Sequence, residues 1–297
     1  MSFYIRKFDI NDFEKIKVLN NDLYFKIKNN KTFNIDNCFV AISNLEKVIG
    51  VCALAYDGTW FYLESKREDI PSYRMQIELF VDDISCKKEV EVALVNEAKK
   101  HIQKFKNIYP DKKLCMRCFV LSNQKDEIQF WLEQGFSTKG IMWIFDFDLK
   151  KTIPIYECNE NISIEKIDFS TEKADYLKAN ELGFFGVQDA ENELSYRVFN
   201  CSALIFCAKK ENEIVSSVTI WEIENKKVAT ENIFTIPNFR RKNICRKTLA
   251  FVLKYLKEKG YEVARLTCES DNDNAISLYF DMGYKYKNHF IELCFQI

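Results

Sequence analysis

Histidine is scarce in this chain, which contains only His101 and His289. Cysteine pairs are scarce too, because Cys115 and Cys118 form the only C-x-x-C. A structural zinc site takes four cysteine or histidine ligands, usually from two such pairs. We therefore expect no metal centre.

Long apolar runs are also missing, since no stretch approaches the roughly 18 residues that a membrane helix requires. The first residues lack the charged segment and apolar core of a signal peptide. The 11 cysteines are odd in number and spread through expected strands and helices, which favours reduced thiols over a disulfide framework. We expect a cytoplasmic protein with no membrane partner.

Neither sign of charge is in excess, because 43 basic and 44 acidic side chains leave a net charge of −1. This balance does not draw the chain as a whole to nucleic acid, so any basic site must be local. Hydrophobic residues make up 47% of the chain and aromatic residues 14%, as in globular proteins. The 297 residues are enough for two domains, each with its own core.

Hydrophobic periodicity predicts a similar order of elements twice. In the first series we expect strands at 3–8, 38–43, 48–56, 75–81, 114–121 and 142–149, and helices at 11–28, 91–105 and 126–134. In the second we expect strands at 162–167, 204–209, 215–224, 228–236, 263–268 and 290–296, helices at 171–182, 191–199 and 274–282, and a helix that ends at Gly260. The polar segment 151–161 contains Pro154 and is the expected linker between domains 1–150 and 162–297.

Two local alignments indicate an internal duplication. Phe80-Val81, before the first long helix, corresponds to Phe234-Thr235, and residues 128–136 correspond to residues 276–284. In the second pair, both helices end at a glycine that is followed by an aromatic residue. Because both alignments occur in the same order, we expect two copies of one fold.

The segment 235–260 reads as a strand end, a basic loop and a helix. Its cations crowd the start of the helix, where the macrodipole already disfavours positive charge. A phosphate held by the free N–H groups of the first turn would offset this repulsion. The alternative is a solvated basic turn without a ligand. The cations are Arg240, Arg241, Lys242, Arg246 and Lys247.

Two motifs of the second half resemble those of the GNAT N-acetyltransferase superfamily. Thr235-Ile236-Pro237 and the loop 240–245 are similar to the family's V-x-P strand end and its R/Q-x-x-G-x-G/A loop. Residues 272–284 are similar to its N-x-x-A-x-x-L-Y-x-x-x-G-F/Y helix. The resemblance implies an α/β (α+β) fold with two tandem GNAT-like domains, each a mixed, mostly antiparallel sheet flanked by helices.

The cosubstrate that the resemblance implies is acetyl-coenzyme A. Its pyrophosphate would lie on backbone N–H groups between Arg241 and Arg246, and its pantetheine arm beside the strand that ends at Ile236. Asn243 and Cys245 stand where the family usually has glycine, but asparagine tolerates a left-handed backbone and cysteine is small. The implied coenzyme-binding residues are Phe234, Thr235, Ile236, Arg240, Arg241, Lys242, Asn243, Ile244, Cys245, Arg246, Asn272 and Ala275, of which Asn272 can also cap its helix.

Tyr279 matches the family tyrosine that donates a proton to the departing thiolate. A phenol, with a pKa of about 10, can donate a hydrogen bond or a proton to the sulfur of a departing thiolate, whose thiol has a pKa of about 8.5. The alternative for Tyr279 is an aromatic residue packed in the core. For the base that deprotonates the amine, our candidate is Glu231 on the strand before the loop, with Glu222 and Glu224 as rivals.

The strand pattern supports this choice of base because residues two apart share a strand face. Ala229, Glu231, Ile233 and Thr235 are therefore expected to project together, toward the acceptor. An exposed position on the strand is the other interpretation of Glu231. Near the acceptor, Phe184-Phe185 and Trp221 either line an apolar pocket or belong to the core, which we favour.

The first copy lacks the groups that would bind and transfer an acyl unit. Its loop 86–91 has no glycine and places carboxylates where phosphates would lie, and Trp131 stands at the position of Tyr279. We expect this copy to be non-catalytic. The second copy would acylate a small-molecule or peptide amine by direct attack.

Two other functions remain to be weighed against acyl transfer. One is a non-catalytic acyl-CoA-binding or regulatory tandem protein, because the loop departs from the family pattern at Asn243 and Cys245. The other is an aminoacyl transferase that uses transfer RNA, which the near-neutral charge disfavours.

Overall fold

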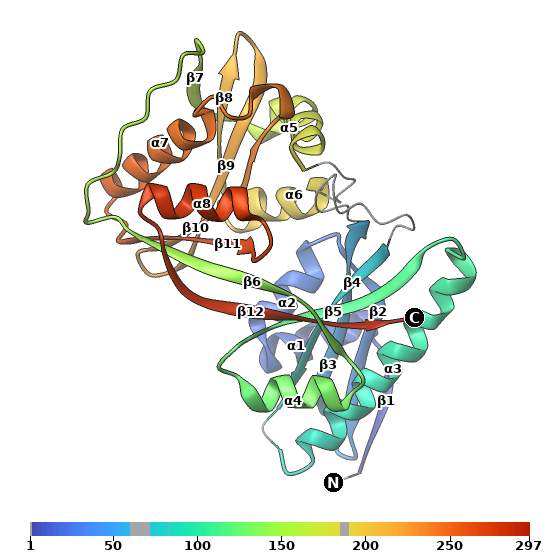
Figure 1. Cartoon of the computed structure of the whole chain (residues 1–297). Coiled ribbons are helices and arrows are strands. Elements are labelled where there is room, and N and C mark those ends of the chain that lie inside the picture. The colour runs from blue at the N-terminus through green and yellow to red at the C-terminus, as the bar shows by residue number, and fades with distance from the viewer. Residues whose placement is uncertain (1, 60–71, 83, 185–189) are drawn as a thin grey trace.

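The computed structural model describes residues 2–59, 72–82, 84–184 and 190–297 (Figure 1). The first half contains β1 (Phe3–Lys7), α1 (Phe13–Leu19), α2 (Asn21–Asn29), β2 (Phe33–Ser43), β3 (Val48–Thr59), β4 (Ser72–Val81), α3 (Lys87–Ile108), β5 (Lys113–Leu121), α4 (Lys125–Glu133) and β6 (Ser137–Asp148). The second contains β7 (Ser163–Ile167), α5 (Phe169–Phe184), α6 (Ala190–Asn200), β8 (Leu204–Lys210), β9 (Glu213–Glu224), β10 (Lys227–Thr235), α7 (Ile244–Glu258), β11 (Val263–Glu269), α8 (Asp273–Met282) and β12 (Lys285–Gln296). Short 3₁₀ turns lie at Ile10–Asp12 and Pro237–Phe239.

Several elements differ from the sequence prediction, and two strands, β2 at Phe33 and β6 at Ser137, begin five residues before the predicted positions. The single helix expected at 11–28 is two helices, α1 and α2, because Asn20 between them has an extended backbone (φ −154°, ψ 101°). The side chain of Asn20 accepts a hydrogen bond from the N–H of Leu23 at 2.9 Å and so caps α2. The last strand, expected at 290–296, already begins at Lys285.

The twelve strands of the described chain form one sheet, in the order β1-β2-β3-β4-β5-β12-β6-β11-β10-β9-β8-β7. The pairs β4–β5 and β10–β11 are parallel, and the other pairs are antiparallel. The predicted mixed, mostly antiparallel architecture is therefore confirmed.

The last strands of the two halves are exchanged. β12, from the end of the chain, pairs with β5 of the first half, whereas β6 pairs with β11 of the second half. β6 and β12 also pair with each other and run together from one half to the other (Figure 1). The buried ion pair between Arg117 Nη1 and Glu292 Oε1, 3.1 Å apart, links β5 to β12 at this junction. Each half is thus completed by a strand from the other.

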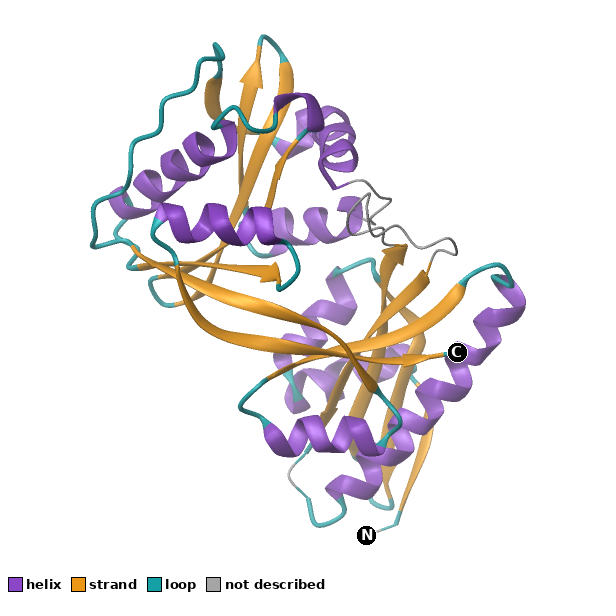
Figure 2. Ribbon diagram, in the orientation of Figure 1, coloured by secondary structure: helices purple, strands orange, loops and turns teal. Residues whose placement is uncertain are grey.

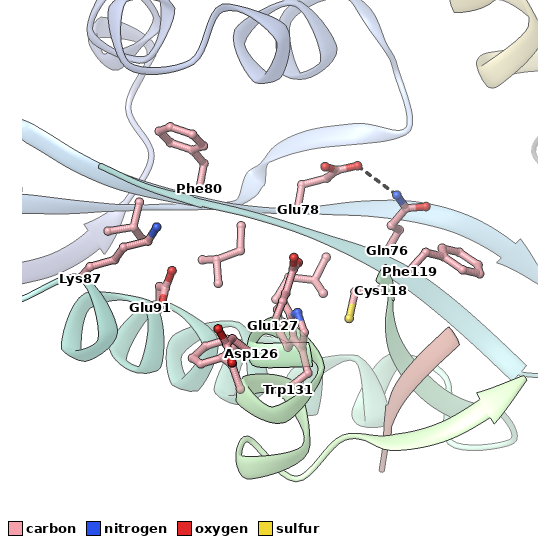
Figure 3. Close-up of a pocket in the computed structure, with 14 residues that line it drawn as sticks. Gln76, Glu78, Phe80, Lys87, Glu91, Cys118, Phe119, Asp126, Glu127 and Trp131 are labelled. Atoms are coloured by element: carbon pink, nitrogen blue, oxygen red, sulfur yellow. Dashed lines mark hydrogen bonds between the residues drawn. The ribbon is translucent and has the colours of Figure 1, made fainter. Parts of the chain in front are cut away.

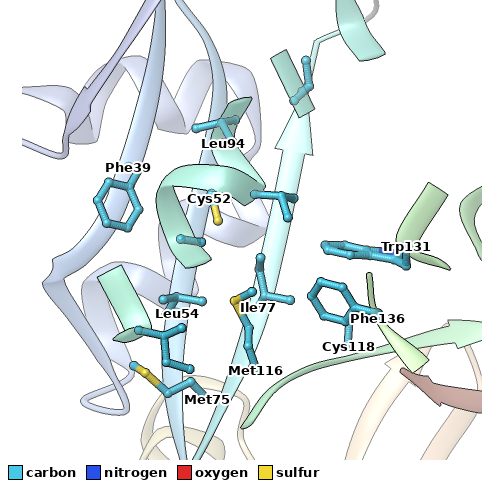
Figure 4. Packing of buried hydrophobic residues seen from close by; sticks show 14 of the residues in the cluster. Phe39, Cys52, Leu54, Met75, Ile77, Leu94, Met116, Cys118, Trp131 and Phe136 are labelled. Atoms are coloured by element: carbon cyan, nitrogen blue, oxygen red, sulfur yellow. The ribbon is translucent and has the colours of Figure 1, made fainter. Parts of the chain in front are cut away.

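Helices cover both faces of the sheet in each half (Figure 2). In the first half, α3 and α4 pack on one face through residues such as Leu94 and Trp131, over Cys52 and Ile77 of the strands (Figure 4). The cluster under α1 and α2 lies on the other face. In the second half, α7 and α8 share one apolar cluster, and α5 and α6 share another. Within the described ranges, no helix has both the length and the hydropathy that crossing a membrane requires.

The parallel strands of each half separate after a few residues. Pairing of β4 with β5 ends at Gln76↔Arg117, although β4 continues to Val81. Pairing of β10 with β11 ends at Ala229↔Arg265, although β10 continues to Thr235. Each half therefore has a gap in the sheet, where backbone groups of the longer strand are not used by its parallel neighbour.

The exchange of β12 also brings two cysteines together. A disulfide joins Cys115 on β5 to Cys294 on β12, with Cα atoms 6.3 Å apart and 179 residues between them in sequence. The expectation that the cysteines are all reduced is therefore wrong for this pair, because sequence spacing does not show which strand lies beside β5. The remaining nine cysteines are free thiols.

Candidate functional site

A cavity of about 490 Å³ lies at the gap between β10 and β11. The end of α5, the end of β10, the basic loop and the first turns of α7 and α8 form its walls. Tyr279 lines it, as do ten of the residues implied for coenzyme binding: Phe234, Thr235, Arg240, Arg241, Asn243, Ile244, Cys245, Arg246, Asn272 and Ala275.

Two of the implied coenzyme-binding residues point elsewhere. The N–H of Ile236 donates to the carbonyl of Val215 at 3.0 Å, and the Ile236 side chain is buried in the cluster under α5. Lys242 forms an ion pair with Glu160 at 2.7 Å, outside the cavity wall. Both residues therefore support the loop without lining the cavity.

The start of α7 is open toward the cavity. Asn243, the residue before the helix, has a left-handed backbone (φ 60°, ψ 10°), and its side chain makes no capping hydrogen bond. Arg241 is also left-handed, with φ 62°. N–H groups of a first helical turn have no acceptor within their helix. The backbone of Ile244, Cys245 and Arg246 is therefore available to an anion.

The arginines of the loop also hold the site together. Arg240 donates to the carbonyls of Thr235 (2.9 Å) and Gly183 (2.8 Å), so it ties β10 to the end of α5. Arg241 donates to Asn274 Oδ1 at 2.6 Å and ties the loop to α8.

Two of the crowded cations have counterions within the chain. Arg246 pairs with Asp281 at 2.7 Å, and Lys242 pairs with Glu160. Hydrogen bonds from Lys210 and Lys242 hold the pKa of Glu160 at about 2, so this carboxylate stays ionised. The repulsion inferred from the sequence is therefore partly offset without any ligand.

A bulge changes the strand that carries Glu231. Asn232 has a left-handed backbone (φ 48°), and the pairing of β10 with β9 shifts between Glu231 and Phe234. Ile233 then packs on the same apolar cluster as Val228. The two residues are five apart, so in a regular strand their side chains would lie on opposite faces of the sheet. The predicted shared face of Ala229, Glu231, Ile233 and Thr235 is therefore wrong.

Glu231 lies at the point where β10 and β11 separate. Its carboxylate accepts hydrogen bonds from the N–H (3.1 Å) and the hydroxyl (3.0 Å) of Thr267 on β11. Burial raises the pKa of Glu231 from 4.5 to about 7. Its rivals lie at the surface, where Glu222 accepts from Tyr261 at 3.2 Å and Glu224 pairs with Lys227 at 2.6 Å.

Tyr279 faces the cavity from α8 and is only 6% exposed. Burial, followed by the nearby Cys268, raises its pKa well above 10, so the phenol keeps its proton. Among the residues that the structure describes, its hydroxyl has no hydrogen-bond partner. The ring packs 5.9 Å from Phe145 and 5.8 Å from Tyr284. Tyr279 is therefore both a core residue and a hydroxyl donor at the cavity wall.

Asn272 performs the capping role that the sequence allows. Its side chain accepts from the N–H of Ala275 at 3.2 Å at the start of α8, while the residue also lines the cavity. Phe184 lines the cavity too, whereas Trp221 lies under the guanidinium of Arg197 at 4.6 Å. Phe185 lies outside the described residues.

Several residues of the site were not found by sequence reasoning. Glu269, two residues after Thr267 on the same face of β11, does not line the cavity, but its pKa is raised to about 7, mainly by burial and then by Asp271. Gly183 packs so closely on Phe234 that an added Cβ would lie 2.6 Å from its ring. The position of Gly183 on α5 gave no signal in the sequence, because it fits an ordinary helix. The other additional lining residues are Ile233, Phe239, Asn274, Ser277 and Leu278.

Comparison with known proteins identifies this arrangement. Residues 170–284, which contain the loop, α7 and α8, match the model of the acetyltransferase (GNAT) family. No curated protein matches the sequence.

Solved structures with this fold include a tandem protein. A GCN5-related N-acetyltransferase from Sphaerobacter thermophilus is similar at 13% identity and a TM-score of 0.68, covering 99% of this chain and 95% of the other. A tandem GNAT protein from the clavulanic acid biosynthesis pathway is similar at 14% identity and a TM-score of 0.66, covering 99% of this chain and 98% of the other. A GCN5-related N-acetyltransferase from Anabaena variabilis is similar at 9% identity and a TM-score of 0.65, covering 99% of this chain and 72% of the other. The predicted resemblance and the tandem GNAT fold are confirmed.

Proposed function

Because the chain has a tandem GNAT fold and its second half matches the acetyltransferase family, we propose that it transfers an acetyl or other short acyl group from coenzyme A to an amine. The observation that carries this proposal is the Tyr279 hydroxyl at the cavity wall, which belongs to a residue only 6% exposed, keeps its proton and has no hydrogen-bond partner among the described residues. The acceptor is a small-molecule or peptide amine, and the reaction is direct attack on the thioester.

The cavity fits coenzyme A in charge and in shape. Arg240, Arg241 and Arg246 line it, and no carboxylate belongs to the part of its wall that the structure describes. The open first turn of α7 can hold the pyrophosphate through backbone N–H groups. The edge of β10 beyond Ala229, which β11 leaves unpaired, can hold the pantetheine arm as an added strand.

In this proposal two proton transfers accompany the reaction. Tyr279 donates to the sulfur as the thioester C–S bond breaks, and its high pKa keeps the donor protonated at neutral pH. Glu231, with a pKa of about 7, accepts the proton that the amine must lose before or during attack. A backbone N–H near Phe234 or Thr235 stabilises the negative charge on the carbonyl oxygen.

The direct test compares turnover with binding. Acetyl-coenzyme A and a panel of amines are supplied to the full chain, free thiol release is followed, and coenzyme affinity is measured in parallel by calorimetry. Turnover with any amine supports the proposal. Binding of coenzyme A without turnover on the panel would favour a non-catalytic acyl-CoA-binding or regulatory protein. The proposal also keeps a cytoplasmic location and includes neither a nucleic-acid nor a membrane partner.

A further inference from the structure

Arg197 of α6 lies over the sheet beside Glu231. Its guanidinium stacks on the ring of Trp221 on β9, 4.6 Å from the ring centroid. Trp221 pairs with Ala229 on β10, and Glu231 follows two residues later on the same face of that strand. Such diagonal neighbours on two antiparallel strands lie roughly 7–8 Å apart. The guanidinium, the indole and the carboxylate of the proposed base are therefore close together on one face of the sheet.

The guanidinium of Arg197 is held in place by a carboxylate that is itself held. Its Nε donates to Glu193 Oε1 at 2.7 Å, one turn earlier on α6. The other oxygen of Glu193 accepts from Asn30 Nδ2 of the first half at 2.8 Å. Asn30 is only 5% exposed. Both oxygens of Glu193 are thus engaged, and of the guanidinium they bind only the Nε group.

The two Nη groups of Arg197 are available to another acceptor. Among the residues that the structure describes, none accepts a hydrogen bond from them, and the side chain is 31% exposed. Trp221 and Glu231 are partly exposed as well, and none of the three residues belongs to the described wall of the coenzyme cavity. A guanidinium with two available Nη groups matches a carboxylate, because donors and acceptors lie in one plane.

The charge of Arg197 also acts on Glu231. Burial raises the pKa of Glu231 to about 7, hydrogen bonds from Thr267 oppose this rise, and the positive charge of Arg197 opposes it further. The described side chains of Arg197 and Glu231 nevertheless form no ion pair, since Glu193 holds the one and Thr267 the other. A cation beside the base repels an acceptor that carries only positive charge, whereas an acceptor with an additional negative group is attracted to both side chains.

The first half lacks this arrangement. Glu78 lies two residues after the parallel pairing of β4 ends, as Glu231 does on β10, and it lines a second cavity, of about 580 Å³ (Figure 3). Its carboxylate accepts from Lys26 of α2 at 3.1 Å and from Gln76 at 2.9 Å, the bond drawn in Figure 3. In the first half the helix cation therefore pairs with the strand carboxylate, whereas in the second half it is held apart from it and can bind a ligand.

We propose that the amine acceptor carries a carboxylate, as a small amino acid does, and that Arg197 binds this carboxylate while the amine lies at Glu231. The inference deepens the proposed function and rests on it in taking Glu231 as the base. Because the two binding groups are close, only a few carbon atoms separate the amine from the carboxylate. The amine nitrogen forms the amide bond as the thioester C–S bond breaks, so the products are an N-acyl amino acid and free coenzyme A.

The turnover test compares amines that differ only in this negative charge. β-Alanine and 4-aminobutanoate are supplied with acetyl-coenzyme A to the full chain, beside β-alaninamide and 4-aminobutanamide, and thiol release is followed. We expect kcat/KM for each acid to exceed that for its amide about tenfold or more. The amides hold the larger fraction of neutral, reactive amine at neutral pH, so a preference for the acids comes from binding of the carboxylate.

Variants of Arg197 test whether this side chain is the cause. Arg197→Gln should abolish the preference, mainly by raising KM for the acids about tenfold, while kcat changes less. Arg197→Lys keeps the charge without the planar fork and should retain part of the preference. The matched control is Lys178→Gln, which removes an exposed cation from α5 of the same half and should prefer the acids as the wild type does. Circular dichroism and coenzyme affinity check that each variant is folded.

A binding measurement separates this inference from the proposed function. The indole N–H of Trp221 is followed by NMR in the full chain labelled with ¹⁵N-tryptophan and saturated with coenzyme A, and its signal is assigned by its loss in Trp221→Phe. We expect 4-aminobutanoate to shift it saturably and 4-aminobutanamide to leave it unchanged. Such a shift without turnover would contradict acyl transfer and support the carboxylate site. Equal kcat/KM for acids and amides, an acid preference that persists in Arg197→Gln, or no shift of Trp221 with the acid would each overturn the inference.

Discussion

The two halves of this chain place a cavity at the same point of the fold and give it opposite charge. In the second half the gap between β10 and β11 meets three arginines, and the described wall holds no carboxylate. In the first half the gap between β4 and β5 meets four carboxylates and one lysine. At the helix that closes each cavity, one half has the phenol of Tyr279 and the other the indole of Trp131.

This comparison separates what the backbone provides from what the side chains decide. Separated parallel strands and a helix start are common to both halves, so each retains space for an extended ligand. The sign of the charge and the acidity of the donor differ between the two cavities, so we expect them not to bind the same ligand. Mutations that change one cavity and leave the other intact test whether the halves have separate roles.

The largest effect is expected for Tyr279→Phe, which removes only the hydroxyl. We expect kcat to fall about 100-fold, because proton donation by a positioned group contributes roughly 10²–10⁴ to a rate. Affinity for coenzyme A should stay within about twofold. Steady-state kinetics and calorimetry measure the two quantities.

Two matched variants sharpen the comparison of the halves. Tyr284→Phe removes a buried hydroxyl that lies 3.4 Å from Thr230 and outside the described cavity wall, so turnover should change little. Trp131→Phe changes the corresponding position of the first half and should leave acyl transfer intact. A loss of turnover in Trp131→Phe equal to that in Tyr279→Phe would contradict separate roles.

The next effect concerns Glu231 and pH. A base must be deprotonated, and since the pKa of Glu231 is about 7, kcat/KM should rise with pH through about 7 and then level off. Glu231→Gln should lower the plateau by about 10- to 100-fold and remove this inflection. Glu269→Gln is the matched control, since its carboxyl also has a pKa of about 7 but lies two residues beyond Thr267, the hydrogen-bond donor to Glu231. An inflection that disappears in Glu269→Gln instead would assign the base to Glu269.

The same carboxyl predicts a pH dependence of stability. The pKa of Glu231 rises from 4.5 to about 7 on folding, so between these values the native state binds a proton that the unfolded state has released. The free energy of unfolding therefore falls as pH rises from about 4.5 to about 7, and this loss is complete above that interval. Relative to wild type, Glu231→Gln should gain Tm between pH 5 and pH 8, as measured by thermal melts. A constant difference between the two proteins would show that Glu231 does not titrate in this range.

A smaller effect is expected at the two helix starts. Arg241→Gln removes a charge from the basic cavity and should weaken coenzyme A binding about tenfold, or about 1.4 kcal/mol. Lys87→Gln removes a charge from the corresponding helix start in the acidic cavity and should leave coenzyme affinity unchanged. Calorimetry measures the affinity of both variants for coenzyme A. A larger loss of affinity in Lys87→Gln than in Arg241→Gln would place the coenzyme in the first half.

The fold was predictable wherever local pattern determines structure. Leu249, Val252, Leu253 and Leu256 recur at helical spacing, and all four are fully buried on α7. The exchange of β6 and β12 was not predictable, because an alternating strand has the same pattern whichever neighbour it pairs with. The break at Asn20 was missed because apolar residues continue on both sides of it.

Most residues of the cavity wall were predictable from the sequence, but the detailed geometry of the cavity was not. The motif positions gave most of the cavity wall, since a loop and two helix starts bring nearby residues together. The additional roles of Arg240, which binds the carbonyls of Thr235 and Gly183, depend on contacts between distant segments. Asn232 inside a strand did carry a signal, because asparagine tolerates the left-handed backbone of a bulge.

The smallest predicted effect concerns the residue that precedes each long helix. Asn243 has φ 60°, where alanine costs about 1 kcal/mol and glycine costs little, so Asn243→Ala should lose about that much stability and Asn243→Gly should lose almost none. Cys86, at the corresponding place in the first half, has φ −110° and a buried side chain, so Cys86→Gly should destabilise by about 1 kcal/mol or more. Chemical denaturation of the three variants measures the differences. If Asn243→Gly keeps or increases the affinity for coenzyme A, the basic cavity requires the backbone conformation and not the asparagine side chain. A loss of affinity would show that the amide itself contacts the ligand.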